Sequence, residues 1–231
     1  IYFGRGGYGV VRIIDQINFD ALKKNPKWLI GYSDITCIHS HIHSNYHCMS
    51  IHAHMSGGYL PAEQDLYATQ SIYDMLFGKK VEYSMASHFL NRNGKAEGIL
   101  CGGNLALLSD LIGTKSDIDT KGKILFIEDI GEYLYNIDRM MWQLKRADKL
   151  STLAGLLVGG FADIKDNTIS FGMQVYDIVY EKVKEYTYPI CFAFPVGHQK
   201  LNYALKCGAN YQLDVQEEQV LLREILQRGE L

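Results

Sequence analysis

Short apolar runs alternate with longer amphipathic segments along this chain, and most runs end on glycine or polar residues. Apolar runs of four to eight residues are typical of buried strands, whereas apolar residues at three- and four-residue spacing are typical of helices. Alternation of the two predicts an α/β protein, in which a sheet is covered by helices. The 231 residues are enough for one large domain or two small ones.

The individual elements follow from this pattern. The predicted strands are Ile1–Phe3, Trp28–Gly31, Gly98–Cys101, Lys123–Ile127 and Leu153–Val158, with further short strands after Tyr203. The predicted helices are Tyr8–Asp15, Asp34–Asn45, Ala62–Leu76, Asn104–Ile112, Tyr135–Ala147 and Met173–Lys184. Residues 78–94 are rich in polar residues and show no regular apolar spacing. They are predicted to link an N-terminal lobe (1–77) to a C-terminal lobe (95–231).

Composition and charge narrow the class of protein. The 47% hydrophobic and 21% charged residues are typical of a soluble globular protein. A net charge of -3 gives no sign of a nucleic-acid or membrane-surface partner, and no apolar run has the roughly 18 to 20 residues of a membrane helix. The five scattered cysteines form no CxxC pair, which favours a reducing, cytoplasmic compartment.

Three chemically active residues follow predicted strands. Ser33 follows WLIGY, Glu128 follows KILFI, and His198 follows ICFAFPVG. Functional groups gather at the carboxyl ends of strands in open α/β sheets. A serine needs a base to take its proton, and a histidine base needs an acid to hold its tautomer. The three residue types are therefore the parts of a nucleophilic triad.

Two local features have more than one interpretation. Ser33 at a strand-to-helix turn is either an exposed nucleophile or the cap of the helix that begins near Asp34. The glycine-rich turn GRGGYG, residues 4–9, either binds a phosphate or supplies a backbone N–H to an oxyanion, although it matches neither a P-loop nor GxGxxG.

The histidines suggest a different chemistry. His39, His43 and His47 recur every four residues and share one face of a helix, as zinc ligands could. The segment contains no HExxH motif and no carboxylate at ligand-like spacing, so a histidine-rich helix face is the preferred interpretation. His52 and His54 alternate as on a strand edge and predict nothing by themselves.

Six blocks of sequence, in order, resemble the LD-carboxypeptidase family of serine peptidases. They are RGGYG (5–9), GYSDIT (31–36), GGNLALLSDLIGT (102–114), ILFIEDIGE (124–132), IDRMMWQL (137–144) and VGH (196–198). The family includes the murein tetrapeptide carboxypeptidases and the microcin C self-immunity peptidases. The resemblance implies a Rossmann-like N-terminal α/β lobe, truncated here because family members carry more chain upstream of RGGYG, and a β-rich C-terminal lobe.

The resemblance also assigns roles. It implies a Ser-Glu-His triad of Ser33, Glu128 and His198, with the backbone N–H groups of Asp34 and Gly7 as the oxyanion hole. The implied reaction is hydrolysis of the L,D amide bond that releases terminal D-alanine from a peptidoglycan tetrapeptide during murein recycling. It needs no metal or organic cofactor, and a homodimer is common in the family.

The sequence defines the substrate-binding residues less clearly than the triad. A carboxypeptidase must bind a free carboxylate, and Arg5 and Arg139 are candidates, with Asn104 as a further substrate-binding candidate. The diamino acid of the substrate, meso-diaminopimelate or lysine, stays open. Alternative functions are a family peptidase that cleaves a peptidyl nucleotide or another amide, a zinc hydrolase built on the histidine cluster, and a binding module without turnover.

Overall fold

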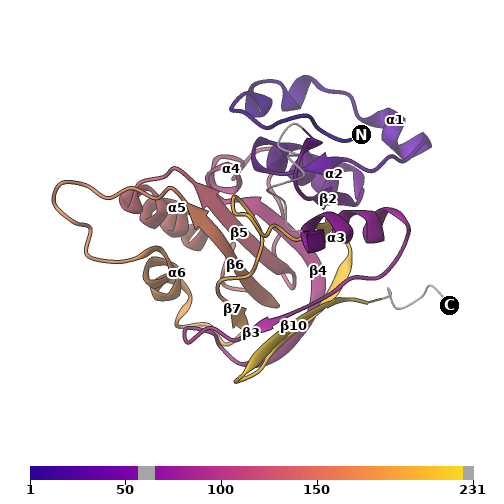
Figure 1. The fold of residues 1–231 in the computed structure, drawn as a ribbon. Coiled ribbons are helices and arrows are strands. Elements are labelled where there is room, and N and C mark those ends of the chain that lie inside the picture. The colour runs from indigo at the N-terminus through magenta and orange to yellow at the C-terminus, as the bar shows by residue number, and fades with distance from the viewer. Residues whose placement is uncertain (57–65, 226–231) are drawn as a thin grey trace.

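The computed structural model describes residues 1–56 and 66–225, which form a small sheet and a large sheet with helices around them (Figure 1). Its helices are α1 (Asp20–Lys24), α2 (Thr36–Tyr46), α3 (Leu66–Leu76), α4 (Leu105–Asp110), α5 (Leu134–Arg146) and α6 (Val175–Val183). Three 3₁₀ turns also occur, η1 (Val10–Arg12), η2 (Ile14–Gln16) and η3 (Ser33–Ile35). None of these helices has both the length and the apolar character needed to cross a bilayer.

The small sheet has the order β1-β2-β8, so it combines two strands from the N-terminal part of the chain with one from the C-terminal part. Its strands are β1 (Ile30–Gly31), β2 (Ser50–His52) and β8 (Leu205–Cys207). β1 and β2 run parallel, with Gly31 opposite His52, while β8 runs antiparallel to β2. The carboxyl ends of β1 and β2 therefore lie at the same edge of this sheet.

The large sheet has the order β3-β10-β9-β4-β5-β6-β7. Its strands are β3 (Glu82–Ala86), β4 (Gly94–Asn104), β5 (Ile124–Ile130), β6 (Gly155–Ala162), β7 (Ile190–Cys191), β9 (Asn210–Val215) and β10 (Gln219–Glu224). β4 to β7 are parallel, and β9, β10 and β3 extend the sheet as antiparallel strands. Residues 78–94, predicted to link two lobes, thus contain an edge strand of the large sheet.

Two hydrophobic clusters cover the large sheet on its two faces. One includes Phe126 and Leu157 together with Ile51 of the small sheet, so the two sheets share a core. The other packs α5 and α6 against β5 and β6, and Figure 1 shows both helices on that side. Burying a side chain such as Leu157 contributes roughly 1.5 to 3 kcal/mol. This packing fixes the ends of β4, β5 and β6 relative to the small sheet.

The predicted α/β alternation is confirmed. The amphipathic helix predicted at 135–147 is α5, and its apolar stripe is core, because Ile137, Met141 and Leu144 are all buried. The predicted helix at 62–76 is α3 from Leu66 onward, and its first four residues lie outside the described residues.

Two local predictions were wrong in detail. The segment predicted as a helix at 8–15 forms η1 and η2, and Asp34 accepts hydrogen bonds from the N–H groups of Gly9 and Val10 at its start. Glu128 was placed after a strand, but β5 continues to Ile130 and contains it.

Candidate active site

The chain turns sharply after β1. Tyr32 is extended, and Ser33 begins η3 with a φ of 61°, a left-handed conformation that is uncommon for a residue with a side chain. No side chain caps η3 or α2, so the interpretation of Ser33 as a helix cap is not supported. A non-glycine residue held at positive φ is often part of a functional site, and this geometry leaves the Ser33 hydroxyl free of a capping bond.

The glycine-rich turn of residues 4–9 packs directly against this serine. A Cβ added at Gly6 would lie 3.2 Å from Ser33 Cβ and 3.3 Å from Ser33 Oγ. The Asp34 carboxylate accepts hydrogen bonds from the N–H groups of Gly9 (3.0 Å) and Val10 (3.2 Å). Gly7 N–H makes no hydrogen bond to another described residue. Within the described part of the chain, Gly7 N–H is therefore a donor without a partner, on a turn whose Gly6 contacts Ser33 and which Asp34 anchors.

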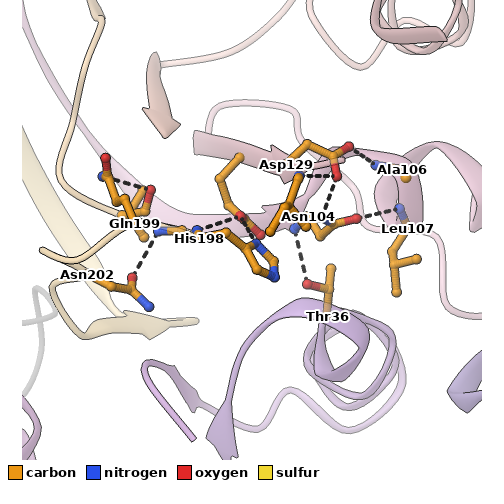
Figure 2. Close-up of polar contacts among 12 residues, drawn as sticks. Thr36, Asn104, Ala106, Leu107, Asp129, His198, Gln199 and Asn202 are labelled. Atoms are coloured by element: carbon orange, nitrogen blue, oxygen red, sulfur yellow. Dashed lines mark hydrogen bonds and ion pairs between the residues drawn. The ribbon is translucent and has the colours of Figure 1, made fainter. Parts of the chain in front are cut away.

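Glu128 and His198 form a hydrogen-bonded pair (Figure 2). His198 Nδ1 lies 2.7 Å from Glu128 Oε2, and the backbone N–H of His198 donates to the same oxygen at 3.2 Å. Glu128 is completely buried, and the His198 side chain is 12% exposed. A buried carboxylate at Nδ1 fixes the imidazole orientation and leaves Nε2 to act as a base.

A β-bulge beside Glu128 shapes the loop that carries His198. Ile127 pairs with Val158, but Asp129 pairs with Phe161, so β6 has one extra residue opposite Glu128. The bulged residues Gly159 and Gly160 let the loop approach, since a Cβ at Gly159 would lie 2.7 Å from the Val196 carbonyl oxygen. Bulges of this kind often re-aim side chains near active sites.

Gly197 is the residue that allows His198 to reach Glu128. Its φ is +106°, and a Cβ at this position would lie 2.6 Å from Glu128 Oε2. Only glycine combines this backbone conformation with so close an approach. Asn202 holds the same loop by accepting a hydrogen bond from Gly197 N–H at 2.9 Å (Figure 2).

Tyr32 connects the pair to the serine turn. Its ring centroid lies 4.7 Å from that of His198, and Ser33 is the next residue along the chain. Burial and, to a smaller extent, the charge of Glu128 raise the pKa of Tyr32. No hydrogen bond joins Ser33 to His198 among the described residues.

Asn104, a predicted substrate-binding residue, is buried in a polar network (Figure 2). Its Nδ2 donates to Asp129 Oδ1 at 2.7 Å, and its Oδ1 accepts from Leu107 N–H at the start of α4. Its backbone N–H donates to Thr36 Oγ1 at 3.1 Å. Both polar atoms of the side chain therefore have internal partners, which favours a positioning role between β4, β5 and α2.

The two candidate arginines lie in different places. Arg5 is exposed on the glycine-rich turn, on the same loop as Gly6 and Gly7. Arg139 is exposed on α5, where its guanidinium lies 5.0 Å from the Tyr135 ring centroid. It also lines an open surface hollow with Trp142 and Arg146. None of the contacts of Arg139 joins it to Ser33, Glu128 or His198.

The three helix histidines do not converge. His39 Nε2 bonds the Gly31 carbonyl at 2.9 Å, and His43 Nε2 lies 3.2 Å from Lys123 Nζ. His47 ends α2 in a left-handed conformation. Within residues 1–56 and 66–225, no group of three histidine, cysteine or acidic side chains is placed to hold a metal ion.

Two other histidines, which the sequence pattern did not single out, lie beside the candidate site. The rings of His52 and His54 each have their centroid 5.9 Å from that of Tyr32. His52 also meets Phe126 edge to face at 4.9 Å. Only the parallel pairing of β1 and β2 brings them to Tyr32, and local sequence contains no signal for that pairing.

We expect the protein to lose stability on acidification because of its buried histidines. Burial lowers the pKa of His39 from 6.5 to about 4, against the raising effect of its bond to Gly31, and lowers that of His52 further. Between pH 6.5 and about pH 4, the His39 side chain is protonated in the unfolded chain but neutral in the folded one. The free energy of unfolding therefore falls as the pH drops through this range. For His39 alone the loss is about 3 kcal/mol.

Urea unfolding between about pH 7.5 and about pH 4.5 measures this loss. His39→Gln keeps a donor for the Gly31 carbonyl and should flatten the pH dependence. His47→Gln, at an exposed histidine, is the matched control and should leave it unchanged. Equal slopes in all three proteins would show that His39 is not a source of the acid sensitivity.

Comparison with known proteins places the chain in a family. A model of the LD-carboxypeptidase N-terminal domain matches residues 1–53, and one of the C-terminal domain matches residues 97–213. The probable murein peptide carboxypeptidase of Bacillus subtilis is 34% identical over 98% of this chain and 72% of its own length.

Solved structures show the same fold. The muramoyltetrapeptide carboxypeptidase of Oxalobacter formigenes has a TM-score of 0.87 and 25% identity, over 95% of this chain and 75% of its own. The microcin C7 self-immunity protein MccF, with a TM-score of 0.83 and 21% identity over 97% of this chain and 75% of its own, shares the fold alone. The predicted two-lobed α/β architecture is thereby confirmed. With both domain models matched in order, the chain belongs to the LD-carboxypeptidase family.

Proposed function

We propose that this protein is a serine carboxypeptidase that releases terminal D-alanine from peptidoglycan tetrapeptides, as in murein recycling. The observation that carries the proposal is the buried Glu128–His198 pair at 2.7 Å, next to a serine held at positive φ. The names of the relatives in B. subtilis and O. formigenes support the substrate class. A cytoplasmic location, expected from the scattered cysteines, and a homodimer, expected from the family resemblance, are part of the proposal.

The mechanism begins with proton transfer from Ser33 to His198 Nε2 as the serine oxygen attacks the scissile carbonyl. Glu128 orients His198 through Nδ1 and stabilises the imidazolium that forms. The N–H groups of Asp34 and Gly7 then bind the oxyanion, and each such donor contributes roughly 3 to 4 kcal/mol in comparable sites.

The second half of the reaction uses the same groups. His198 gives its proton to the leaving amine of D-alanine, which departs and leaves an acyl-enzyme on Ser33. Water, deprotonated by His198, hydrolyses this ester. The acyl side is the L-centre of a diamino acid, either meso-diaminopimelate or lysine. The site is built from groups of this chain, and no step of this mechanism draws on a metal ion.

Product mass spectrometry on a murein tetrapeptide tests the proposal. We expect the protein to remove one alanine, with the same rate after treatment with a chelator. A peptidyl nucleotide, incubated in parallel, tests the alternative that the protein is a microcin C-like peptidase. Cleavage of the peptidyl nucleotide without cleavage of the tetrapeptide would contradict the murein substrate. Loss of activity with chelator would favour the zinc hydrolase alternative built on His39, His43 and His47.

A further inference from the structure

The proposed reaction places a negative charge close to His198. Terminal D-alanine carries its amine and its carboxylate on one carbon, so the carboxylate oxygens lie within about 4 Å of the leaving nitrogen. His198 must reach that nitrogen to protonate it. The group that binds the carboxylate must therefore be a neighbour of His198 with a polar atom to spare for the substrate. Arg139 on α5 stacks on Tyr135 instead. Asn104 lies opposite Glu128 in the sheet, but both polar atoms of its side chain have internal partners.

Strand register places His54 beside the serine turn. Gly31 at the end of β1 pairs with His52 at the end of the parallel β2. Ser33 and His54 are each two residues beyond these partners, so both leave the small sheet at the same edge. Met55, the residue after His54, agrees with this placement. A Cβ added at Gly6 would lie 3.4 Å from Met55 Cε and 3.2 Å from Ser33 Cβ, so Met55 and Ser33 both pack against Gly6.

His54 and His198 both lie beside the ring of Tyr32. The Tyr32 ring lies 5.9 Å from the ring of His54 and 4.7 Å from that of His198, between centroids. The electrostatic influence of His198 on His54 agrees with this arrangement. His54 is thus an imidazole that contacts the same aromatic ring as the proposed general acid.

The Nε2 atom of His54 is buried and has no hydrogen-bond partner among the described residues. A buried polar atom without a partner is unfavourable unless a ligand supplies the missing bond. A carboxylate oxygen is the strongest partner that an imidazolium N–H can have. The unpaired atom therefore suits an anion that arrives with the substrate.

We propose that His54 binds the terminal carboxylate of the substrate and selects peptides with a free C-terminal end. The inference rests on the proposed function. Burial lowers the pKa of His54, and the nearby His198 lowers it further. A hydrogen bond to the Lys200 backbone has the opposite effect, smaller than that of burial. The free site is then mostly neutral, and an incoming carboxylate raises that pKa again and draws a proton onto the ring.

The test compares a murein tetrapeptide with the same peptide carrying a C-terminal carboxamide. We expect the wild-type protein to prefer the free acid. His54→Asn should lower kcat/KM for the acid by about 10- to 100-fold, mainly through KM, and leave the amide unchanged. His47→Asn, the same change at an exposed histidine, should alter neither. Equal losses on acid and amide would show a structural role and overturn the inference.

Binding measurements separate this inference from the proposed function. Calorimetric titration of acid and amide peptides into Ser33→Ala, and into Ser33→Ala combined with His54→Asn, needs no turnover. Tighter binding of the acid that disappears with His54→Asn supports the carboxylate site even if the wild-type protein releases no alanine. Equal affinity for acid and amide in Ser33→Ala, or no binding of either, overturns it.

Discussion

Ser33→Ala is expected to lower kcat for alanine release by roughly 10⁵- to 10⁶-fold, as loss of a nucleophile does in other serine peptidases. The substitution removes the attacking oxygen and leaves the Glu128–His198 pair untouched. Mass spectrometry of the tetrapeptide after long incubation measures the residual rate. Release of alanine at more than about one hundredth of the wild-type rate would contradict the assignment of Ser33 as nucleophile.

A second substitution at this position separates chemistry from backbone strain. Ser33 adopts a φ of 61°, which glycine tolerates without penalty. Ser33→Gly should be as inactive as Ser33→Ala but more stable than it, by about 1 kcal/mol in the free energy of unfolding. Activity in either variant would show that the turn, and not the hydroxyl group, is what the reaction needs.

Glu128→Gln is expected to lower kcat by about 10³- to 10⁴-fold. Glutamine has the shape of glutamate, but it carries no charge to stabilise the imidazolium and can hold His198 in the wrong tautomer. Glu97→Gln is the matched control, because Glu97 is an exposed residue of β4 that bonds Gln212. Steady-state kinetics on the tetrapeptide measures both. A loss of less than about tenfold for Glu128→Gln would remove the carboxylate from the mechanism.

The strand-end pattern predicted much of this site because it depends on local sequence. An apolar run followed by a polar residue marks where a strand leaves the core, and Ser33 follows the end of β1 in this way. His198 does not, because β7 ends at Cys191 and His198 lies in the loop beyond it. The contact between Glu128 and His198 was implied by the family resemblance, and the structure forms it. The bulge opposite Glu128 was missed, because it depends on how β5 pairs with β6, and one sequence segment does not specify its partner's register.

Contacts between residues distant in sequence also account for the other features of the structure that the sequence analysis did not predict. His54 reaches the site only through the pairing of Gly31 with His52. The segment at 8–15 forms 3₁₀ turns, and a side chain from another part of the chain, Asp34, anchors its start. Asn104 looked available for substrate, yet its partners Thr36 and Asp129 lie far away in sequence. In each case the contact joins residues that are distant in sequence, so a local pattern does not contain it.

The position of β8 has a consequence for the order in which the protein folds as it is synthesised. β8 covers one edge of β2, but its residues emerge from the ribosome about 150 positions after β2 (Ser50 to Cys207). Until then that edge exposes unpaired backbone groups, which is a risk for aggregation. The strand arrives directly after the loop that carries His198. Closure of the small sheet and completion of the Glu128–His198 pair therefore both wait for the last part of this sequence, and a nascent chain without it has no assembled site.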